Sequence, residues 1–209
     1  MPTLLHIDSS PLGEASISRQ LTREFVRQWK QAHPEGQIIA RDLTTSSLAV
    51  IDAEWIAAAY TPEEVRTGRQ RQVLSLSDAL IGELEAADEY VFGVPMHNFS
   101  IPSTFKLWID QIARAGKTFT YDAGGAAGLL KGKRATFIAA SGAVYEAGTP
   151  LGTLNFVEPY LRSAFGFLGV TDVVFINAGG ASAIRTGKVD RGTFLQPHVE
   201  SIRAAVQAA

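Results

Sequence analysis

The chain has 209 residues, of which 46% are hydrophobic and 19% are charged, the balance of a folded globular protein rather than a disordered or fibrous one. Its formal net charge of −2 provides no broad positive field for nucleic acid or anionic lipid, and the absence of cysteine excludes disulfides and cysteine-bound metal clusters. Because no apolar run is long enough to span a membrane and no secretory signal opens the chain, we expect a cytoplasmic protein with one domain over residues 1–209.

Short apolar segments alternate with longer stretches of helical periodicity along the chain. This alternation predicts an α/β fold in which a five-stranded parallel sheet carries helices on both faces. After the first strand, apolar residues recur every four positions from Ile17 to Trp29 and predict an amphipathic helix that ends near Pro34. The five predicted strands are residues 4–8, 37–42, 89–94, 134–140 and 172–177.

Further boundaries are indicated by capping and turn residues. Residues 61–64 combine a threonine, a proline and two glutamates, and predict that a helix starts there or just beyond. Ser103 is expected to cap a later helix. Residues 118–121 are expected to form a short extended arm, and the glycine-rich residues 124–128 a surface loop.

The loop after the first predicted strand, residues 8–18, contains four serines and leads into the first helix. In an open parallel sheet, ligands bind beyond the carboxyl ends of the strands, where N–H groups at a helix N-terminus attract anions. The loop lacks both the glycine spacing of a dinucleotide site and the lysine of a triphosphate site, so a single phosphate, as in FMN, fits it best. The alternative is that Ser16 or Ser18 only caps the helix.

A second loop at the same edge of the sheet follows the third predicted strand, over residues 95–103. Two prolines stiffen it, while Met96 and Phe99 offer apolar surface and Asn98 offers a donor and an acceptor to a flat heteroaromatic ring. As a group these residues suit the ring of a flavin. Taken one at a time, Met96 and Phe99 are more typical of core packing, and His97 is more typical of a polar surface.

Taken together, these segments resemble the FMN-dependent NADH azoreductases, which are flavodoxin-like quinone and azo-dye reductases. The resemblance covers nearly the whole chain. It is carried by residues 9–10, 16–18, 95–99, 113–116, 118–121, 159–161 and 165–173. It implies FMN as the bound cofactor, with the phosphate held by Ser10, Ser16, Ile17 and Ser18, and the isoalloxazine ring lined by Met96, His97, Asn98 and Phe99.

The third flavin segment of that family follows the fourth strand and usually reads serine-arginine-glycine-glycine. In this chain the segment is Ala140, Ser141, Gly142 and Ala143, and the resemblance still assigns it to the cofactor. His97 stands where well-known members of the family carry tyrosine. Residues 145–156 form a stretch a few residues longer than in the family, and we expect substrate preference to change there.

The resemblance implies an NAD(P)H:quinone oxidoreductase that also cleaves aromatic azo compounds to amines by a ping-pong, two-electron mechanism. NADH or NADPH is the electron donor, and no catalytic side chain is expected because the chemistry takes place on FMN. The family forms homodimers with the flavin sites at the interface. Phe99, Phe119, Tyr121 and Phe167 are the candidates for stacking on the substrates, and each has a core-packing alternative, which is favoured for Phe167.

Two other functions remain open from the sequence. A flavodoxin-type electron carrier would bind FMN without nicotinamide turnover, but the nearly neutral charge argues against it, since such carriers are strongly acidic. The second open function is that of a regulatory flavodoxin-like module without turnover. No metal site is expected, because His33 and His198 fall on helical surfaces and His6 falls inside the first strand. The sequence does not identify the physiological oxidant.

Overall fold

The computed structural model describes residues 1–122 and 124–208. Its centre is a five-stranded parallel sheet with the strand order β2-β1-β3-β6-β7. The predicted strands and the α/β class are confirmed, and strand ends differ from the prediction by one residue at most. The strands are β1 (Thr3–Asp8), β2 (Gln37–Asp42), β3 (Glu89–Pro95), β6 (Arg134–Ala140) and β7 (Asp172–Ala178).

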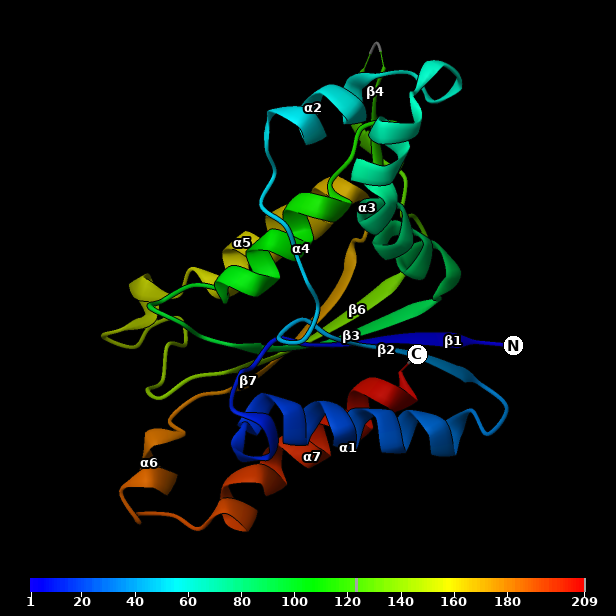
Figure 1. Ribbon diagram of the computed structural model, residues 1–209. Helices are drawn as coiled ribbons and strands as arrows, with labels where there is room; N and C mark the ends of the chain where they lie inside the picture. Colours follow the sequence, from blue (N-terminus) through cyan, green and yellow to red (C-terminus); the bar gives the residue numbers. More distant parts are fainter. Residues whose placement is uncertain (123, 209) are drawn as a thin grey trace.

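Helices cover both faces of the sheet (Figure 1). On one face lie α1 (Ile17–Ala32) and α7 (Arg191–Gln207), and on the other lie α3 (Gly68–Ala86), α4 (Ser103–Ile112) and α5 (Val157–Leu168). Successive side chains of a strand point to opposite faces, so Val91 packs under α1 while Phe92 packs under α4 and α5. Within the described ranges, no helix is both long and apolar enough to cross a membrane.

The helix predicted to start at residues 61–64 begins later. These residues include a single 3-10 turn, Glu63–Val65, and an additional helix, α2 (Ala53–Tyr60), precedes it. The start of α3 is set instead by a capping box. The Thr67 hydroxyl accepts from the Gln70 N–H at 3.2 Å, and the side-chain Oε1 of Gln70 accepts from the Thr67 N–H at 2.9 Å. This reciprocal pair fixes the helix start more strongly than the proline does.

The prediction that Ser103 caps α4 was wrong. Ser103 is the first residue inside the helix, and the N-cap position is held by Pro102, which makes no side-chain cap. The first turn closes on the backbone, since the Lys106 N–H donates to the Pro102 carbonyl at 3.0 Å. The loop after β3 therefore enters α4 directly through its second proline.

A two-stranded arm projects from the sheet beyond α4 (Figure 1). It consists of β4 (Phe119–Asp122) and β5 (Gly125–Gly128), which pair in antiparallel fashion. The expected extended arm is confirmed, but of the surface loop expected at residues 124–128, residues 125–128 form a strand. The reason is close packing: a side chain at Gly128 would overlap the backbone of Gly169 at the end of α5, so only glycine lets β5 dock there.

Candidate active site

A cavity of about 410 Å³ lies beyond the carboxyl edge of the sheet. This edge of the sheet is at the left of Figure 1. The cavity volume is within the size range of pockets that bind small molecules and cofactors. The loops after β1, β3, β6 and β7 all contribute to its wall. The residues that were predicted from the sequence and that line it are Ser10, Ser16, Ile17, Met96, Ala140, Ser141 and Gly142.

The serine loop after β1 forms one end of the cavity. Ser10, Ser16 and Ser18 are all buried, and the hydroxyls of Ser16 and Ser18 lie 3.1 Å apart. The Ser16 hydroxyl accepts from the Arg19 N–H at 3.3 Å, which confirms that Ser16 caps α1. The first N–H groups of a helix have no intrahelical acceptor and carry a partial positive charge. These hydroxyls and N–H groups together fit a phosphate. Capping of α1 by Ser16 leaves the other hydroxyls and N–H groups available to bind it.

Arg19 ties this loop to the ends of two strands. Its Nε donates to the Ser10 carbonyl at 2.8 Å, and its Nη2 donates to Asp42 Oδ1 at 2.7 Å, at the end of β2. Its Nη1 lies 3.8 Å from the Asp8 carboxylate, which is buried and also accepts from the Thr22 hydroxyl at 2.9 Å. The serine loop is thus held in place without the help of a ligand.

This network makes a prediction for acid stability. Burial alone would raise the pKa of Asp42, but hydrogen bonds from Arg19 and Thr44 and the Arg19 charge lower it to about 2. Because the ordinary value is about 4, the stabilisation is complete above about pH 4 and is lost as the pH falls towards 2. We expect Asp42→Asn to cost about 1 to 2 kcal/mol at neutral pH, allowing for solvent screening.

The measurement is the free energy of urea unfolding of the wild type and Asp42→Asn at several pH values. The difference between the two proteins should shrink as the pH falls from 4 to 2. A constant difference over that range would contradict the assigned role of Asp42.

The loop after β3 contains a tight turn at the rim of the cavity. The His97 N–H donates to the Ser100 carbonyl at 2.9 Å, and the Ser100 N–H donates back to His97 at 3.1 Å. The two central residues, Asn98 and Phe99, have positive φ angles of 48° and 72°. Asparagine tolerates that region, but for phenylalanine it is strained. Met96 lines the cavity, whereas His97, Asn98 and Phe99 stand exposed beside it.

The strain at Phe99 can be measured with two variants that both remove the ring. At a left-handed position glycine avoids a steric cost of about 1 to 2 kcal/mol that alanine bears, so we expect Phe99→Gly to be more stable than Phe99→Ala by about 1 kcal/mol. Chemical denaturation of the two proteins measures the difference. If Phe99→Ala proves as stable as Phe99→Gly, the backbone at this position is not strained.

The third predicted flavin segment lies between the two loops. Ala140, Ser141 and Gly142 line the cavity, and Ala143 is not among the lining residues. The carbonyls of Ser141 and Gly142 accept at 3.0 Å from the N–H groups that begin α6 (Ser182–Arg185). Backbone bonds therefore place this segment, whichever side chains it carries.

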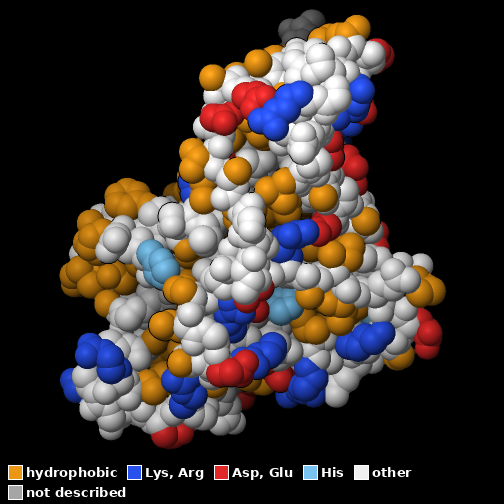
Figure 2. Space-filling model, viewed as in Figure 1, with side chains coloured by type: hydrophobic (Ala, Val, Ile, Leu, Met, Phe, Trp, Pro, Cys, Tyr) orange, Lys and Arg blue, Asp and Glu red, His pale blue; other side chains and the backbone are white. Residues whose placement is uncertain are grey.

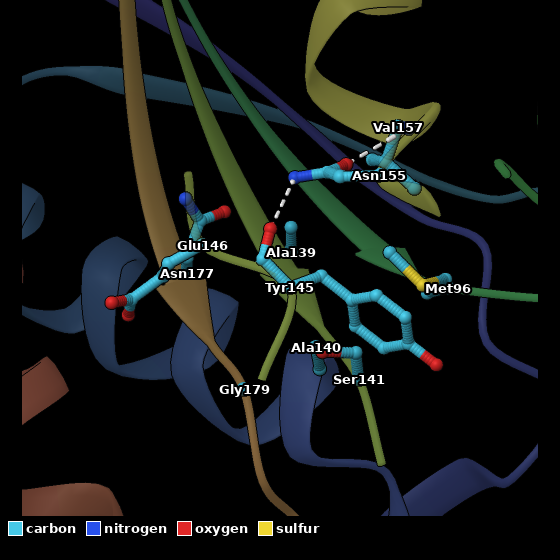
Figure 3. A pocket seen from close by; sticks show the side chains of 10 residues that line it. All are labelled: Met96, Ala139, Ala140, Ser141, Tyr145, Glu146, Asn155, Val157, Asn177 and Gly179. Atoms are coloured by element: carbon cyan, nitrogen blue, oxygen red, sulfur yellow. Dashed lines mark hydrogen bonds between the residues drawn. The ribbon is translucent and has the colours of Figure 1, made fainter. Parts of the chain in front are cut away.

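The long stretch at residues 145–156 packs against the turn of the second loop. The Phe156 N–H donates to the Phe99 carbonyl at 3.0 Å, and the rings of Phe99 and Tyr145 meet edge to face at 6.2 Å. Asn155 fixes the stretch, since its amide donates to the Tyr145 carbonyl at 3.3 Å and accepts from the Val157 N–H at 3.1 Å. Figure 3 shows these two bonds and the Tyr145 side chain beside Met96 and Ser141. Residues 145–156 thus lie beside the predicted ring site.

Three of the predicted stacking residues form a separate cluster. The Phe119 ring lies 5.6 Å from that of Tyr121 and 4.7 Å from that of Phe167. Tyr121 is 69% exposed and Phe167 is 42% exposed, so Phe167 is not a core residue. The cluster lies at the C-terminal end of α5, while the stretch beside the cavity leads into its N-terminal end, about 18 Å away along the helix. Of the four predicted stacking residues, Phe99 alone stands near the cavity of its own chain.

The part of the cavity wall that follows β7 was not predicted from the sequence. Ala181, Ile184, Arg185 and Arg191 all line the cavity. A signal for them existed, because Gly179 and Gly180 follow the fifth predicted strand at the same carboxyl edge of the sheet. The segment was not predicted because it contains a single serine, Ser182, and no aromatic residue.

Comparisons with known proteins agree with this architecture. A family model described as having a flavodoxin-like fold matches residues 2–196. An FMN-dependent NADH:quinone oxidoreductase of Acidobacterium capsulatum is 55% identical over 203 residues, which cover 97% of this chain and 98% of the relative. A protein of the same name from Nostoc punctiforme is 46% identical, over 100% of this chain and 98% of the relative.

Solved structures give the same picture. An FMN-dependent NADH-azoreductase from Bacillus anthracis, solved in complex with FMN, superposes with a TM-score of 0.86 and 27% identity, covering 100% of this chain and 99% of the other. The azoreductase AzrA superposes with a TM-score of 0.88 and 25% identity, over 99% and 100% of the two chains.

Proposed function

Because the chain belongs to the family with the flavodoxin-like fold, we propose that it is an FMN-dependent NADH:quinone oxidoreductase. The observation that carries the proposal is the match to relatives of that name over nearly the full length of both chains. In this chain the serine loop opens into a cavity of cofactor size, which agrees with the match. The solved azoreductases favour reductive cleavage of azo compounds as a second activity on the same site.

The residues around the cavity fit FMN in one orientation. The phosphate would be held by the buried hydroxyls of Ser10, Ser16 and Ser18 and by the first N–H groups of α1. The isoalloxazine ring would lie between Met96 and the 140–143 segment. When bound, FMN accepts a hydride from NADH and passes two electrons to the second substrate. The protein supplies position and shelter from water, and Asn98 and the exposed Phe99 ring stand where the substrates would enter.

A homodimer would complete the site. The cluster of Phe119, Tyr121 and Phe167 is too far from the cavity of its own chain, but Tyr121 and Phe167 are exposed, and the cluster would cover the cavity of a partner. A second exposed apolar surface adjoins the cavity, and Figure 2 shows hydrophobic side chains gathered at that edge of the molecule. This surface consists of Phe99, Val144, Leu151 and Phe156. Association of the two surfaces would bury both and place aromatic rings over the flavin.

Steady-state rates test the proposal and its main alternative. The protein loaded with FMN should reduce quinones with NADH, and initial rates at several NADH concentrations should give the parallel double-reciprocal lines of a ping-pong reaction. Azo dyes should be cleaved more slowly, because each bond needs two rounds of reduction. NADPH is measured alongside to set the nicotinamide preference. An electron carrier would bind FMN but show no quinone reduction with either nicotinamide.

A further inference from the structure

Two arginines line the cavity beside the serine loop. They were not predicted from the sequence, and the proposed function does not involve them. Arg185 is the last residue of α6, Arg191 is the first residue of α7, and both share the cavity wall with Ser10 and Ser16. Figure 2 shows basic side chains gathered at the lower left of the molecule, where Figure 1 places α6. Their position matters because the loop from residue 8 to 18 contains no lysine or arginine of its own.

Neither arginine is neutralised by a carboxylate within the described part of the chain. The Arg185 side chain makes no hydrogen bond or ion pair there, and the Arg191 side chain only donates to the Ala15 carbonyl at 3.1 Å. Two acidic residues adjoin this contact, Glu14 next to Ala15 and Asp190 next to Arg191, and both have other partners. Glu14 pairs with an arginine of α1 at 2.6 Å, and Asp190 caps α7. Two uncompensated positive charges therefore border the cavity.

The third arginine near the loop cannot play this role. Arg19 is held by Asp42 at 2.7 Å, with the Asp8 carboxylate 3.8 Å away, so its charge is already balanced. The bond from Arg191 to the Ala15 carbonyl has a second effect. Ala15 also lines the cavity, and its carbonyl oxygen is the negative end of a dipole that would repel an anion. The arginine bound to this oxygen offsets that repulsion.

Resting on the proposed function, we propose that Arg185 and Arg191 are FMN-binding residues that supply the counter-charge for its phosphate. A phosphate monoester carries between one and two negative charges at neutral pH, and hydroxyls and N–H groups alone leave that charge uncompensated. Hydrogen bonds between an arginine and a phosphate are about twice as strong as neutral ones. The pair thus makes this chain select FMN over riboflavin, which has the same ring but no phosphate.

The test compares the affinities of FMN and riboflavin by quenching of flavin fluorescence. We expect Arg185→Gln to raise the Kd for FMN about tenfold, and Arg185→Gln with Arg191→Gln to raise it about a hundredfold. The Kd for riboflavin should not change. Arg185→Lys keeps the charge and should recover most of the affinity. Lys188→Gln is the matched control, because it removes one positive charge from the exposed turn between α6 and α7 without touching the cavity.

Several results would overturn the inference. One is an unchanged Kd for FMN in the double variant. Another is an equal loss of FMN and riboflavin affinity, which would mean that the cavity is deformed. A third is an unchanged Kd for FMN with a raised KM for NADPH, which would assign the arginines to the nicotinamide substrate. Failure of the wild type to bind FMN is a separate outcome, because it would contradict the proposed function itself.

Discussion

Replacing Ser16 with aspartate should leave the apoprotein folded and remove most of its affinity for FMN. Aspartate is as good an N-cap as serine, and its charge also suits the helix dipole, so α1 should keep its stability. The same carboxylate would face the phosphate of FMN across the buried Ser16–Ser18 pair. Loss of a hydroxyl donor combined with charge repulsion should raise the Kd for FMN by about a hundredfold or more.

Ser16→Ala and Ser18→Ala in one protein form the complementary variant. This protein loses both hydroxyls and also the cap, which costs about 1 kcal/mol of folding free energy. Flavin affinity is measured by fluorescence quenching, and stability is measured by urea unfolding of each apoprotein. If both variants bind FMN as tightly as the wild type, the serine loop is a helix cap and nothing more.

Gly128→Ala should separate the arm from the body of the protein and reduce quinone turnover. The added methyl group would overlap the backbone nitrogen of Gly169, so β5 cannot keep its place against the end of α5. Overpacking of this kind costs about 1 to 3 kcal/mol. It also breaks the contact between Phe119 and Phe167, and we expect kcat/KM for quinones to fall about tenfold.

Gly82→Ala is the matched control for this variant. Gly82 lies inside α3, and a methyl group there would meet no atom within 4 Å beyond the neighbouring backbone of its own helix, so the change should leave the protein as stable or make it slightly more stable. Sedimentation velocity of both proteins reports whether the proposed dimer forms. Wild-type turnover and wild-type association in Gly128→Ala would contradict the role given to the arm.

The sheet could be predicted from the sequence because each strand is a short apolar segment between strong helix signals. Phe92, for example, stacks on Phe137 across the sheet at 4.8 Å, and both belong to apolar segments that are recognisable without a structure. The start of α3 was harder, because two capping signals compete within seven residues. The reciprocal bonds of Thr67 and Gln70 prevail over the proline at position 62.

The remaining differences arise from contacts between segments that are distant in the sequence. The glycine and alanine residues of β5 predict a loop, because these residue types carry no local strand signal. The strand is explained only by the packing of Gly128 against Gly169. Arg185 and Arg191 likewise join the cavity only because β7 ends at the same edge as β1. Residues of this kind can be predicted only when the strand order is known, whereas Ser10 and Ser16 were predicted from the sequence of their own loop.

Anaerobic titration of the protein loaded with FMN is the most direct test of the proposed function. We predict that the visible absorbance of the bound flavin is bleached by a stoichiometric amount of NADH in a single two-electron step, and that addition of a quinone restores it. Absorbance that is unchanged by NADH, in a protein that does hold FMN, would contradict the account.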